Sequence, residues 1–489
     1  MGTAATNMTP FVTAKDPVRS QMGDAMKRMR PSLTFLGGVG TVTGSKFLLD
    51  TGTTRVLLEC GLFQGLSNLR RRNWAEPPVD WHTVDAVVLT HAHLDHSGYL
   101  PVLARQGWSG PVYVTPGTAR LAQIVLADSA HLQEEDARYA AEGGWSKHAT
   151  PRPLYDTADA ARACELFVPA PHGETTHITT DVALTFGRAG HILGSAWAQL
   201  DVAGVDRRLV HSGDMGRAEH PLLRPPEPRP ACDALLLEST YGDRLRHDEN
   251  SWDVLASAIT RTVERGGSVL VPAFAVDRTE VLLTALRDLT HTGRIPDVPI
   301  VVDSPMALAC LRIYREAIAQ RWPEIRPGLA VDALDTRGLV EVQTAEESKH
   351  WNKPSSPAII VSASGMATGG RVLHHLKALL PDARNTIAIV GFAAEGTRAR
   401  QLMEGARQVK IHGDYVPVRA EVVALDAFSA HADSDELTAW AAGATGGTAP
   451  HTCYVVHGEE HSSQAFAERL RRELNWTAVV PREGERVLV

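Results

Sequence analysis

The sequence predicts an α/β protein that contains two domains, or one domain with a large insertion. Its 489 residues are too many for one core of ordinary size, and 44% of them are apolar, enough to bury a large interior. Short strand-like runs dominate the first part of the chain. From about residue 249 strands alternate with helices instead, which indicates a parallel α/β unit.

The first part reads as β-rich because its apolar runs are short and are separated by glycine and threonine turns. A helix is expected near residues 97–107, and helical periodicity covers 116–145 and 157–165. In chain order, the runs that predict strands are SLTFLGG, KFLLD, RVLLEC, DAVVLT, ALTFG, WAQLDV, RRLVHSGD and DALLLEST.

The second part has the alternation of a sheet whose strands are joined by helices. The expected strands of this unit are GSVLVPAF, VPIVVD, PAIIVSAS and NTIAIVGF, and its expected helices cover residues 277–290, 304–320 and 370–379. After residue 419 the pattern closes with the strand AEVVALD, a helix over 434–443, the strand TCYVVH and a helix over 463–473.

Composition narrows the class of protein. No apolar stretch approaches the roughly 20 residues of a membrane span, and residues 1–30 lack the apolar core of a signal peptide, so they read as a flexible leader. The five cysteines are scattered and form no C-x-x-C, which argues against disulfides and thiolate zinc sites and favours the cytoplasm. With a net charge of −8, the chain needs a local basic patch and bound metal to hold nucleic acid.

The stretch THAHLDHSG, residues 90–98, places three histidines and a carboxylate within six positions at the end of a predicted strand. His91 and His93 are two apart and can point at one ion, while Asp95 and His96 lie further along and can reach a second. A lone histidine on an apolar strand is usually an ordinary core residue, but four such groups need partners if they are buried. The stretch therefore predicts part of a metal site.

Three more candidate ligands each follow a predicted strand beside glycine. They are His191 in GRAGHILGSA, Asp214 in HSGDMGR and His457 in YVVHGEE. Each alone could be an ordinary turn or strand-end residue. Together with the first four they complete two nitrogen- and oxygen-rich sites of the kind that zinc accepts.

These motifs, in this order, resemble the metallo-β-lactamase fold hydrolases and, more narrowly, the β-CASP nucleases. The broader resemblance is carried by H-x-H-x-D-H, G-H-x-x-G-S, S-G-D-x-G and V-H-G-E. The narrower one is carried by LLLESTYGDR, VPAFAVDRTE, GFAAEGT, VPVRAEV and FSAHAD. It covers residues 31–489 and is nearer to prokaryotic relatives of the cleavage and polyadenylation endonuclease subunit than to RNase J.

The resemblance implies a four-layer αβ/βα metallo-β-lactamase core, formed by residues 31–248 and 419–489. A parallel α/β β-CASP domain at 249–418 would interrupt this core. We expect the substrate in the cleft between the two.

The resemblance also implies roles for the candidate residues. It assigns one zinc ion to His91, His93 and His191 and the other to Asp95, His96 and His457. Asp214 would bridge the two ions. Its β-CASP motifs fall on Glu238 in LEST, His431 in SAHAD and His457, and a histidine at the last of these positions favours RNA over DNA. Asp95, Glu238 and His431 are the expected catalytic residues.

Hydrolysis of a phosphodiester needs a hydroxide, charge stabilisation at phosphorus and a proton for the departing oxygen. A water that bridges two zinc ions meets the first two needs, and we expect His431 to meet the third. His431 precedes Asp433 and Glu436, which predict a capping box at a helix start. That helix end disfavours imidazolium, so a contact with Glu238 would be needed to raise the pKa again. Otherwise His431 only orders the helix start and Glu238 only caps a turn.

Two positions depart from the family pattern. Glu59 in RVLLECG stands where Asp is usual, at a residue that orients metal ligands by hydrogen bonds, so geometry or metal preference can differ. Asp277 in PAFAVDR stands where Gly is usual, and a carboxylate near the expected phosphate path could pair with an arginine.

The loop SASGMATGG offers small residues and free amides at a helix N-terminus, which suits a phosphate. Ordinary turn chemistry explains this loop equally well. The glycine-rich GGVGTVTGSK fits neither dinucleotide nor P-loop patterns, so it is expected to be a turn that borders the metal site. The residues considered for contact with the RNA backbone are Arg278, Ser362, Ser364, Gly365, Arg371 and Arg400.

The sequence thus predicts a ribonuclease with two zinc ions (Zn2+) per chain that cleaves single-stranded RNA, leaving a 5′-phosphate and a 3′-hydroxyl, as the resemblance implies. RNase J, the model for the 5′-exonuclease alternative, usually carries an additional C-terminal domain. This sequence ends soon after its last predicted strand, which favours endonucleolytic cleavage. Three alternatives stay open: a 5′-exoribonuclease, a small-molecule hydrolase, for which the insertion has no use, and a silent RNA-processing scaffold, which would lack ligands. No membrane partner is expected, and a homodimer is compatible with the sequence.

Overall fold

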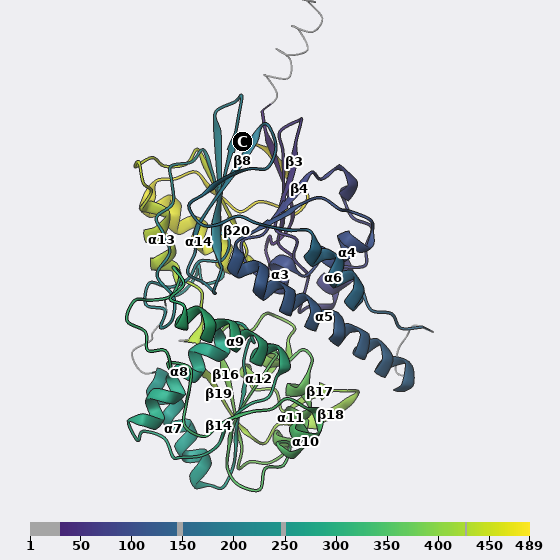
Figure 1. Cartoon of the computed structure of the whole chain (residues 1–489), viewed down its shortest axis with the longest axis vertical. Helices are drawn as coiled ribbons and strands as arrows, with labels where there is room; N and C mark the ends of the chain where they lie inside the picture. The colour runs from purple at the N-terminus through teal and green to yellow at the C-terminus, as the bar shows by residue number, and fades with distance from the viewer. Residues whose placement is uncertain (1–29, 144–149, 246–250, 426–427) are drawn as a thin grey trace, which may run out of the picture.

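The computed structural model describes residues 30–143, 150–245, 251–425 and 428–489. The chain forms two parts that follow one another along the long axis of the molecule (Figure 1). Segments from both ends of the chain build one part, and the green segment between them builds the other. The predicted leader lies outside the described residues except for Arg30.

The first sheet of the core contains seven strands in the order β22-β1-β2-β3-β4-β5-β6. Helices α4 (Leu100–Arg105), α5 (Pro116–Gly143) and α6 (Thr157–Glu165) pack on its outer face. Its strands are β1 (Ser32–Gly37), β2 (Lys46–Asp50), β3 (Arg55–Leu58), β4 (Ala86–Val88), β5 (Val112–Val114), β6 (Phe167–Pro169) and β22 (Arg486–Leu488).

The second sheet also contains seven strands, in the order β21-β20-β11-β10-β9-β8-β7. Helices α13 (Ser434–Ala442) and α14 (Glu460–Leu474) pack on its outer face. Its strands are β7 (Thr175–His177), β8 (Val182–Arg188), β9 (Ala196–Val202), β10 (Arg207–His211), β11 (Ala234–Glu238), β20 (Thr452–Val456) and β21 (Ala478–Val479).

The two sheets share an apolar core between their inner faces. Phe35 and Phe47 of the first sheet pack there with Leu200 and Leu236 of the second, and all four are fully buried. Helices cover the two outer faces, so the layers run helix, sheet, sheet, helix. This confirms the predicted four-layer αβ/βα architecture.

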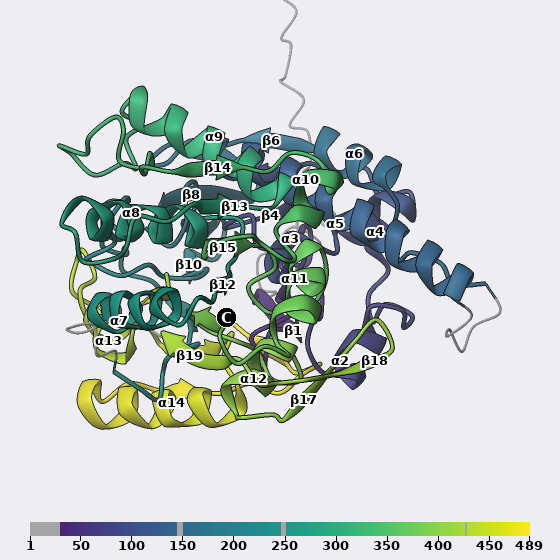
Figure 2. The same cartoon turned by 90° about the horizontal axis from the view of Figure 1, so that it is seen from below.

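The inserted domain is built on a six-stranded sheet in the order β14-β13-β15-β12-β16-β19, in which every pairing is parallel. A parallel sheet is covered on both faces, which explains its continuous apolar strands. Figure 2 shows α7 and α8 on one side of these strands and α11 on the other. The strands are β12 (Val269–Pro272), β13 (Ile300–Val302), β14 (Leu339–Glu341), β15 (Ile359–Ser362), β16 (Thr386–Val390) and β19 (Glu421–Leu425).

The helices of this domain divide between the two faces of its sheet. Helices α7 (Ser251–Glu264), α8 (Arg278–His291) and α9 (Pro305–Ala319) pack on one face. Helices α11 (Arg371–Leu379) and α12 (Arg398–Met403) pack on the other. The remaining elements are α10 (Ala345–His350), the hairpin β17 (Gln408–Ile411) and β18 (Asp414–Pro417), and, in the core, α2 (Ser67–Arg72), η1 (Trp81–Thr83) and α3 (Leu94–Ser97).

Strand β19 lies on the other side of the domain boundary from where the sequence placed it, because that boundary was predicted at residue 418. The run AEVVALD was placed in the core, but β19 pairs in parallel with β16, so the sheet of the inserted domain reaches Leu425. A buried strand has the same sequence pattern in either domain, and only its pairing decides where it belongs. The helix expected over 97–107 is also divided, because α3 ends at Ser97 and α4 begins at Leu100.

The topology brings the candidate residues to one edge of the core. Strands β10, β11 and β20 are parallel neighbours, so their C-terminal ends lie together. Asp214, Glu238 and His457 stand at these ends, and the inserted domain follows β11 at the same edge. Within the described ranges, no helix combines the length and the apolar character that crossing a membrane requires.

Candidate metal centre

Three histidine side chains near the end of β4 direct nitrogen atoms at one point. His91 Nε2 lies 3.2 Å from His93 Nδ1, and His191 Nε2 lies 3.3 Å from the same His93 atom. Ligand atoms around a tetrahedral zinc ion, each about 2.0–2.1 Å from it, are roughly 3.3 Å apart. The spacing therefore fits three nitrogen atoms that surround one ion.

A second group lies beside the first and consists of Asp95, His96 and His457. The ligand atoms of these three residues lie within 4.8 Å of one another. The His96 and His457 rings are 4.5 Å apart, and His457 Nε2 is 3.9 Å from Asp95 Oδ2. The group offers two imidazole nitrogens and one carboxylate.

Asp214 lies between the two groups and turns one oxygen atom to each. Its Oδ2 is 3.4 Å from His91 Nε2 and 3.7 Å from His191 Nε2. Its Oδ1 is 3.2 Å from His96 Nε2 and 3.4 Å from His457 Nε2. Burial opposes ionisation, but the surrounding histidines hold the pKa of Asp214 well below its ordinary value. One ionised carboxylate thus faces both groups.

Several buried atoms of these groups have no hydrogen-bond partner among the described residues. Burial and neighbouring histidines keep the pKa values of His93 and His191 well below their ordinary value, so both rings are neutral at pH 7. Unpartnered buried polar atoms are costly, and a metal ion would satisfy the two that face each other across the second group, His96 Nε2 and Asp214 Oδ1. The residues therefore fit metal ions. The atoms are His93 Nε2, His96 Nδ1 and Nε2, His191 Nδ1 and Asp214 Oδ1.

Two hydroxyl groups that no sequence motif singled out contact the rings of candidate ligands. Ser45 Oγ lies 2.9 Å from His457 Nδ1, and Thr90 Oγ1 lies 3.1 Å from His91 Nδ1. Such contacts fix the orientation of a ligating imidazole. Both residues had a signal, since Thr90 adjoins His91 and Ser45 belongs to GGVGTVTGSK, the turn expected to border this site.

Glu59 reaches the second group from the end of β3. Its Oε1 accepts a hydrogen bond from His211 Nε2 at 3.1 Å and lies 3.6 Å from His96 Nδ1. Burial would raise the pKa of Glu59, but His96 and His211 hold it far below its ordinary value. Glu59 therefore stands where an orienting residue was expected. Nothing in the local sequence marked His211 as its partner.

His431 and Glu238 lie together beside Asp214. His431 Nδ1 is 3.2 Å from Glu238 Oε1, and His431 Nε2 is 3.9 Å from Asp214 Oδ2. The Glu238 carboxylate also accepts hydrogen bonds from the backbone amides of Met215 at 2.7 Å and Thr240 at 3.1 Å. These amides fix the carboxylate, which in turn fixes the imidazole.

The surroundings of His431 favour its charged form. Burial lowers the pKa of His431, but the charge and hydrogen bond of Glu238, followed by the charge of Asp214, raise it above the ordinary value. Arg278 is near enough for its charge to lower this pKa in part. The capping box predicted from Asp433 and Glu436 is present at the start of α13.

Three of the residues considered for RNA contact have partners inside the inserted domain. Arg371 Nη1 is 2.7 Å from Asp303 Oδ1, and Ser362 Oγ donates to the Asp303 backbone oxygen at 2.8 Å. Arg400 pairs with Glu404 at 2.6 Å. These contacts engage the side chains within the protein, and their binding to RNA stays a prediction.

The other candidates lie nearer the histidines. Gly365 packs so closely on Phe274 that a Cβ atom there would lie 2.6 Å from its ring, and the Phe274 ring is 6.0 Å from that of His93. Ser364 Oγ is 3.1 Å from Thr368 Oγ1. Glycine at 365 therefore allows the loop to approach the metal centre.

Within the described part of the chain Asp277 has no arginine partner, contrary to the pairing expected from the sequence. Its carboxylate instead contacts His220 Nε2 at 3.0 Å and Tyr314 Oη at 2.9 Å. Both donors are buried at the junction of the two parts.

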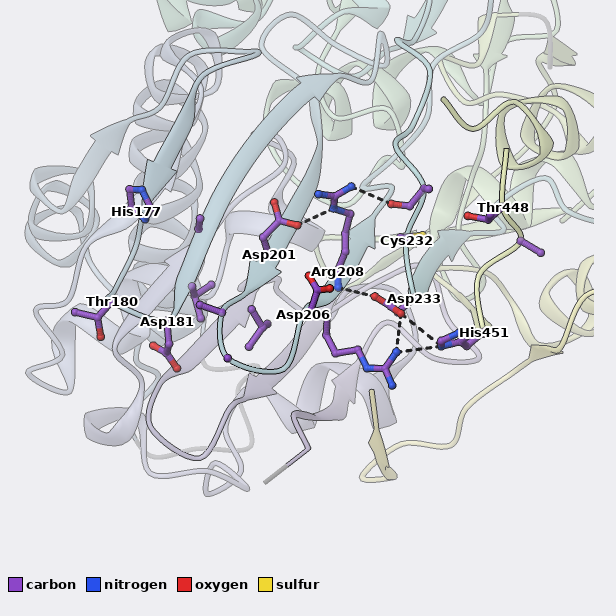
Figure 3. Close-up of a pocket in the computed structure, with 18 residues that line it drawn as sticks. His177, Thr180, Asp181, Asp201, Asp206, Arg208, Cys232, Asp233, Thr448 and His451 are labelled. Atoms are coloured by element: carbon purple, nitrogen blue, oxygen red, sulfur yellow. Dashed lines mark hydrogen bonds and ion pairs between the residues drawn. The ribbon is translucent and has the colours of Figure 1, made fainter. Parts of the chain in front are cut away.

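A separate cavity of about 910 Å³ lies at the ends of β8 and β10 that are opposite to His191 and Asp214. Figure 3 shows residues that line it, among them Asp181, which precedes β8. Several of its charged side chains pair with one another, as in Arg208 with Asp201 at 2.6 Å. None of the predicted site residues lines it.

Three family models match successive parts of this chain. A beta-lactamase superfamily domain matches residues 45–266, and a Beta-Casp domain matches residues 279–402. A Zn-dependent metallo-hydrolase RNA specificity domain matches residues 415–481.

Similar proteins of known name span most of the chain. Ribonuclease TTHA0252 of Thermus thermophilus is 38% identical over 437 residues, which cover 89% of this chain and 94% of that protein. An RNase J-like protein of Methanocaldococcus jannaschii is 32% identical and covers 92% of this chain and 98% of its own. Transcription termination factor FttA of the same organism is 31% identical over 92% of this chain and 70% of its own length.

A solved structure supports the fold alone. A protein of unknown function from Enterococcus faecalis V583 has a TM-score of 0.51 at 11% identity and covers 94% of this chain and all of its own. The family evidence comes from the matched domains, the identities to relatives and the His and Asp cluster. This chain belongs to the β-CASP nuclease family of metallo-β-lactamase fold enzymes, which are metal-dependent hydrolases.

Proposed function

We propose that this chain is a ribonuclease that hydrolyses phosphodiester bonds of single-stranded RNA with two zinc ions. One observation carries the proposal: the two oxygens of Asp214 face two separate groups of ligand atoms. Two neighbouring metal positions that share a ligand suit phosphodiester hydrolysis. The matched RNA specificity domain and the relatives named ribonuclease and RNase J-like favour RNA as the substrate.

The ligands divide into two sets around Asp214. When bound, the ions would make water acidic enough to attack at neutral pH and would neutralise charge on the phosphate. Ser45, Thr90 and Glu59 keep ligand rings oriented for this task. One zinc ion would be held by His91, His93 and His191, the other by Asp95, His96 and His457, and Asp214 would contribute an oxygen to each.

His431 gives the proton to the departing 3′-oxygen. Glu238 Oε1 accepts a hydrogen bond from Nδ1–H of His431. The other ring nitrogen, Nε2, faces Asp214 and is the atom that gives the proton. The raised pKa of His431 keeps more of it protonated near neutral pH. The products are a 5′-phosphate and a 3′-hydroxyl.

Cleavage within the strand is the form of attack that we propose. Near the scissile bond, the proposed contacts to the RNA backbone come from two places. One is Arg278, whose charge reaches His431, and the other is the loop of Ser364 and Gly365 beside Phe274.

The test is cleavage of labelled single-stranded RNA and of DNA of the same sequence by the zinc-loaded chain and by Asp95→Ala. RNA should be cut, DNA should not, and Asp95→Ala should lose activity together with zinc. A circular RNA separates the two modes, because a circle has no end to enter. A chain that cuts only linear RNA is a 5′-exonuclease. A chain that leaves RNA intact but hydrolyses a thioester or lactone would refute the proposal.

A further inference from the structure

Asp277 holds a backbone conformation that only glycine adopts without strain. Its φ is 70° and its ψ is −49°, and the Arg278 amide donates to the Val276 oxygen at 2.8 Å. This is a γ-turn of the rare kind with positive φ at its centre. A strained residue persists where its surroundings hold it, often at functional sites.

The carboxylate is 1% exposed and accepts a hydrogen bond at each oxygen. Tyr314 Oη donates to Oδ1 at 2.9 Å, and His220 Nε2 lies 3.0 Å from Oδ2. His220 Nδ1 accepts from the amides of Leu222 and Leu223 at 3.1 and 3.0 Å, so its proton is on Nε2. Both partners are therefore donors to Asp277.

Each partner is joined to a loop that carries a proposed metal ligand. Tyr314 Oη also accepts a hydrogen bond from the Leu193 amide at 3.0 Å, and Leu193 lies two residues after His191. His220 belongs to the segment that leads away from Asp214. One carboxylate at the start of α8 in the inserted domain thus ties down two ligand loops of the core.

The surroundings of a second buried carboxyl group nearby favour its neutral form. Glu280 follows Asp277 by one turn of α8 and is fully buried, and its oxygens have no hydrogen-bond partner in the described structure. Burial, followed by the charge of Asp277, raises the pKa of Glu280 well above its ordinary value. The hydrogen-bond donors at this place therefore serve Asp277 and not Glu280.

We propose that Asp277 is a positioning residue for the metal centre. Its carboxylate fixes the loops of His191 and Asp214, so the inserted domain helps to set the geometry of ligands that belong to the core. The inference rests on the proposed metal site and does not depend on the substrate. Loss of the carboxylate frees both loops, and the ions are then held more weakly.

The test compares the zinc affinity of full-length variants by competition with a chromogenic chelator. Asp277→Asn keeps the shape of the side chain and should weaken zinc binding about 10–100-fold, as for other residues that orient ligands. Tyr314→Phe should have a smaller effect in the same direction, because Asp277 keeps His220. Asp277→Gly relaxes the strained turn, folds without the carboxylate, and should match Asp277→Asn.

The matched control is Asp303→Asn in the same domain. Asp303 is an equally buried carboxylate, and its partners Arg371, His375 and Ser348 lead to no metal ligand. Its loss should leave zinc affinity unchanged. Wild-type affinity in Asp277→Asn and Asp277→Gly, or an equal loss in Asp303→Asn, would overturn the inference while the proposed function stands. A wild-type chain that takes up no zinc would overturn both.

Discussion

Asp214 Oδ1 lies 3.2 Å from His96 Nε2, while the other oxygen of the same carboxylate faces His91 at 3.4 Å. The two histidines belong to different groups of ligand atoms. Because one side chain contacts both groups, the two proposed metal positions would not be independent. Replacing Asp214 should therefore weaken metal binding at both positions, whereas replacing a ligand that faces one group should weaken it at one.

The first prediction concerns metal content after gel filtration, measured by elemental analysis. We expect about two zinc ions per wild-type chain and about one in His191→Ala, since His191 faces only one group. Asp214→Ala should hold fewer than one, because both positions lose a ligand and the bridging charge. Equal zinc content in the two variants would contradict a shared carboxylate.

The candidate ligands could be singled out from the sequence because they stand in short motifs, most of which follow a strand end. His91 follows β4, and Asp214 follows β10 within S-G-D-x-G. Residues that act through a ligand were harder to find. His211 and Tyr314 occupy ordinary strand and helix positions, and only the fold brings them to Glu59 and Leu193.

The fold was predictable where periodicity was long and strong, as in α5 and in the buried strands β12 and β15. The three-residue edge strands β6 and β14 were not, because so short a run carries no alternation and its neighbour decides its conformation. The hairpin of β17 and β18 did have a signal in the sequence, the glycine at position 413. The two turn residues His412 and Gly413 both have positive φ, as a two-residue hairpin turn requires, and glycine adopts positive φ readily.

A second prediction concerns the pair of Glu59 and His211. Glu59→Asp shortens the side chain by one methylene, so its carboxylate cannot keep its contacts to both His211 and His96. Zinc affinity should fall about 10–100-fold. A double-mutant cycle with His211→Phe tests whether the two residues act together. Strictly additive losses in zinc affinity would show that His211 does not act through Glu59.

A third prediction concerns Asp128 on α5. Burial raises its pKa to about 6, although His131 and Arg371 oppose the shift. Between pH 3.8, its ordinary pKa, and about 6, the folded protein keeps a proton that the unfolded chain releases. The contribution of Asp128 to the free energy of unfolding therefore falls as pH rises through this window.

Asp128→Asn removes this pH-dependent cost. In urea unfolding at pH 8 the variant should be more stable than wild type by about 1–3 kcal/mol. The gain should shrink as the pH falls and vanish below about pH 3, where the carboxyl group is protonated in both the folded and the unfolded state. A gain of the same size at every pH would trace the effect to something other than ionisation of this carboxyl group.

The last prediction separates two ways in which His431 could matter. If His431 protonates the departing 3′-oxygen, His431→Ala should keep its zinc content and cut RNA on the order of 10²–10⁴-fold more slowly. A phosphodiester with a 4-nitrophenyl leaving group needs no such proton, because the phenolate leaves unaided. The same variant should then lose little activity on that ester. If both substrates lose activity equally, His431 positions the phosphate and is not the acid. Glu238→Gln, like His431→Ala, should slow cleavage of RNA much more than cleavage of the nitrophenyl ester. The reason is that Glu238 contacts His431 Nδ1 at 3.2 Å and raises the pKa of the ring.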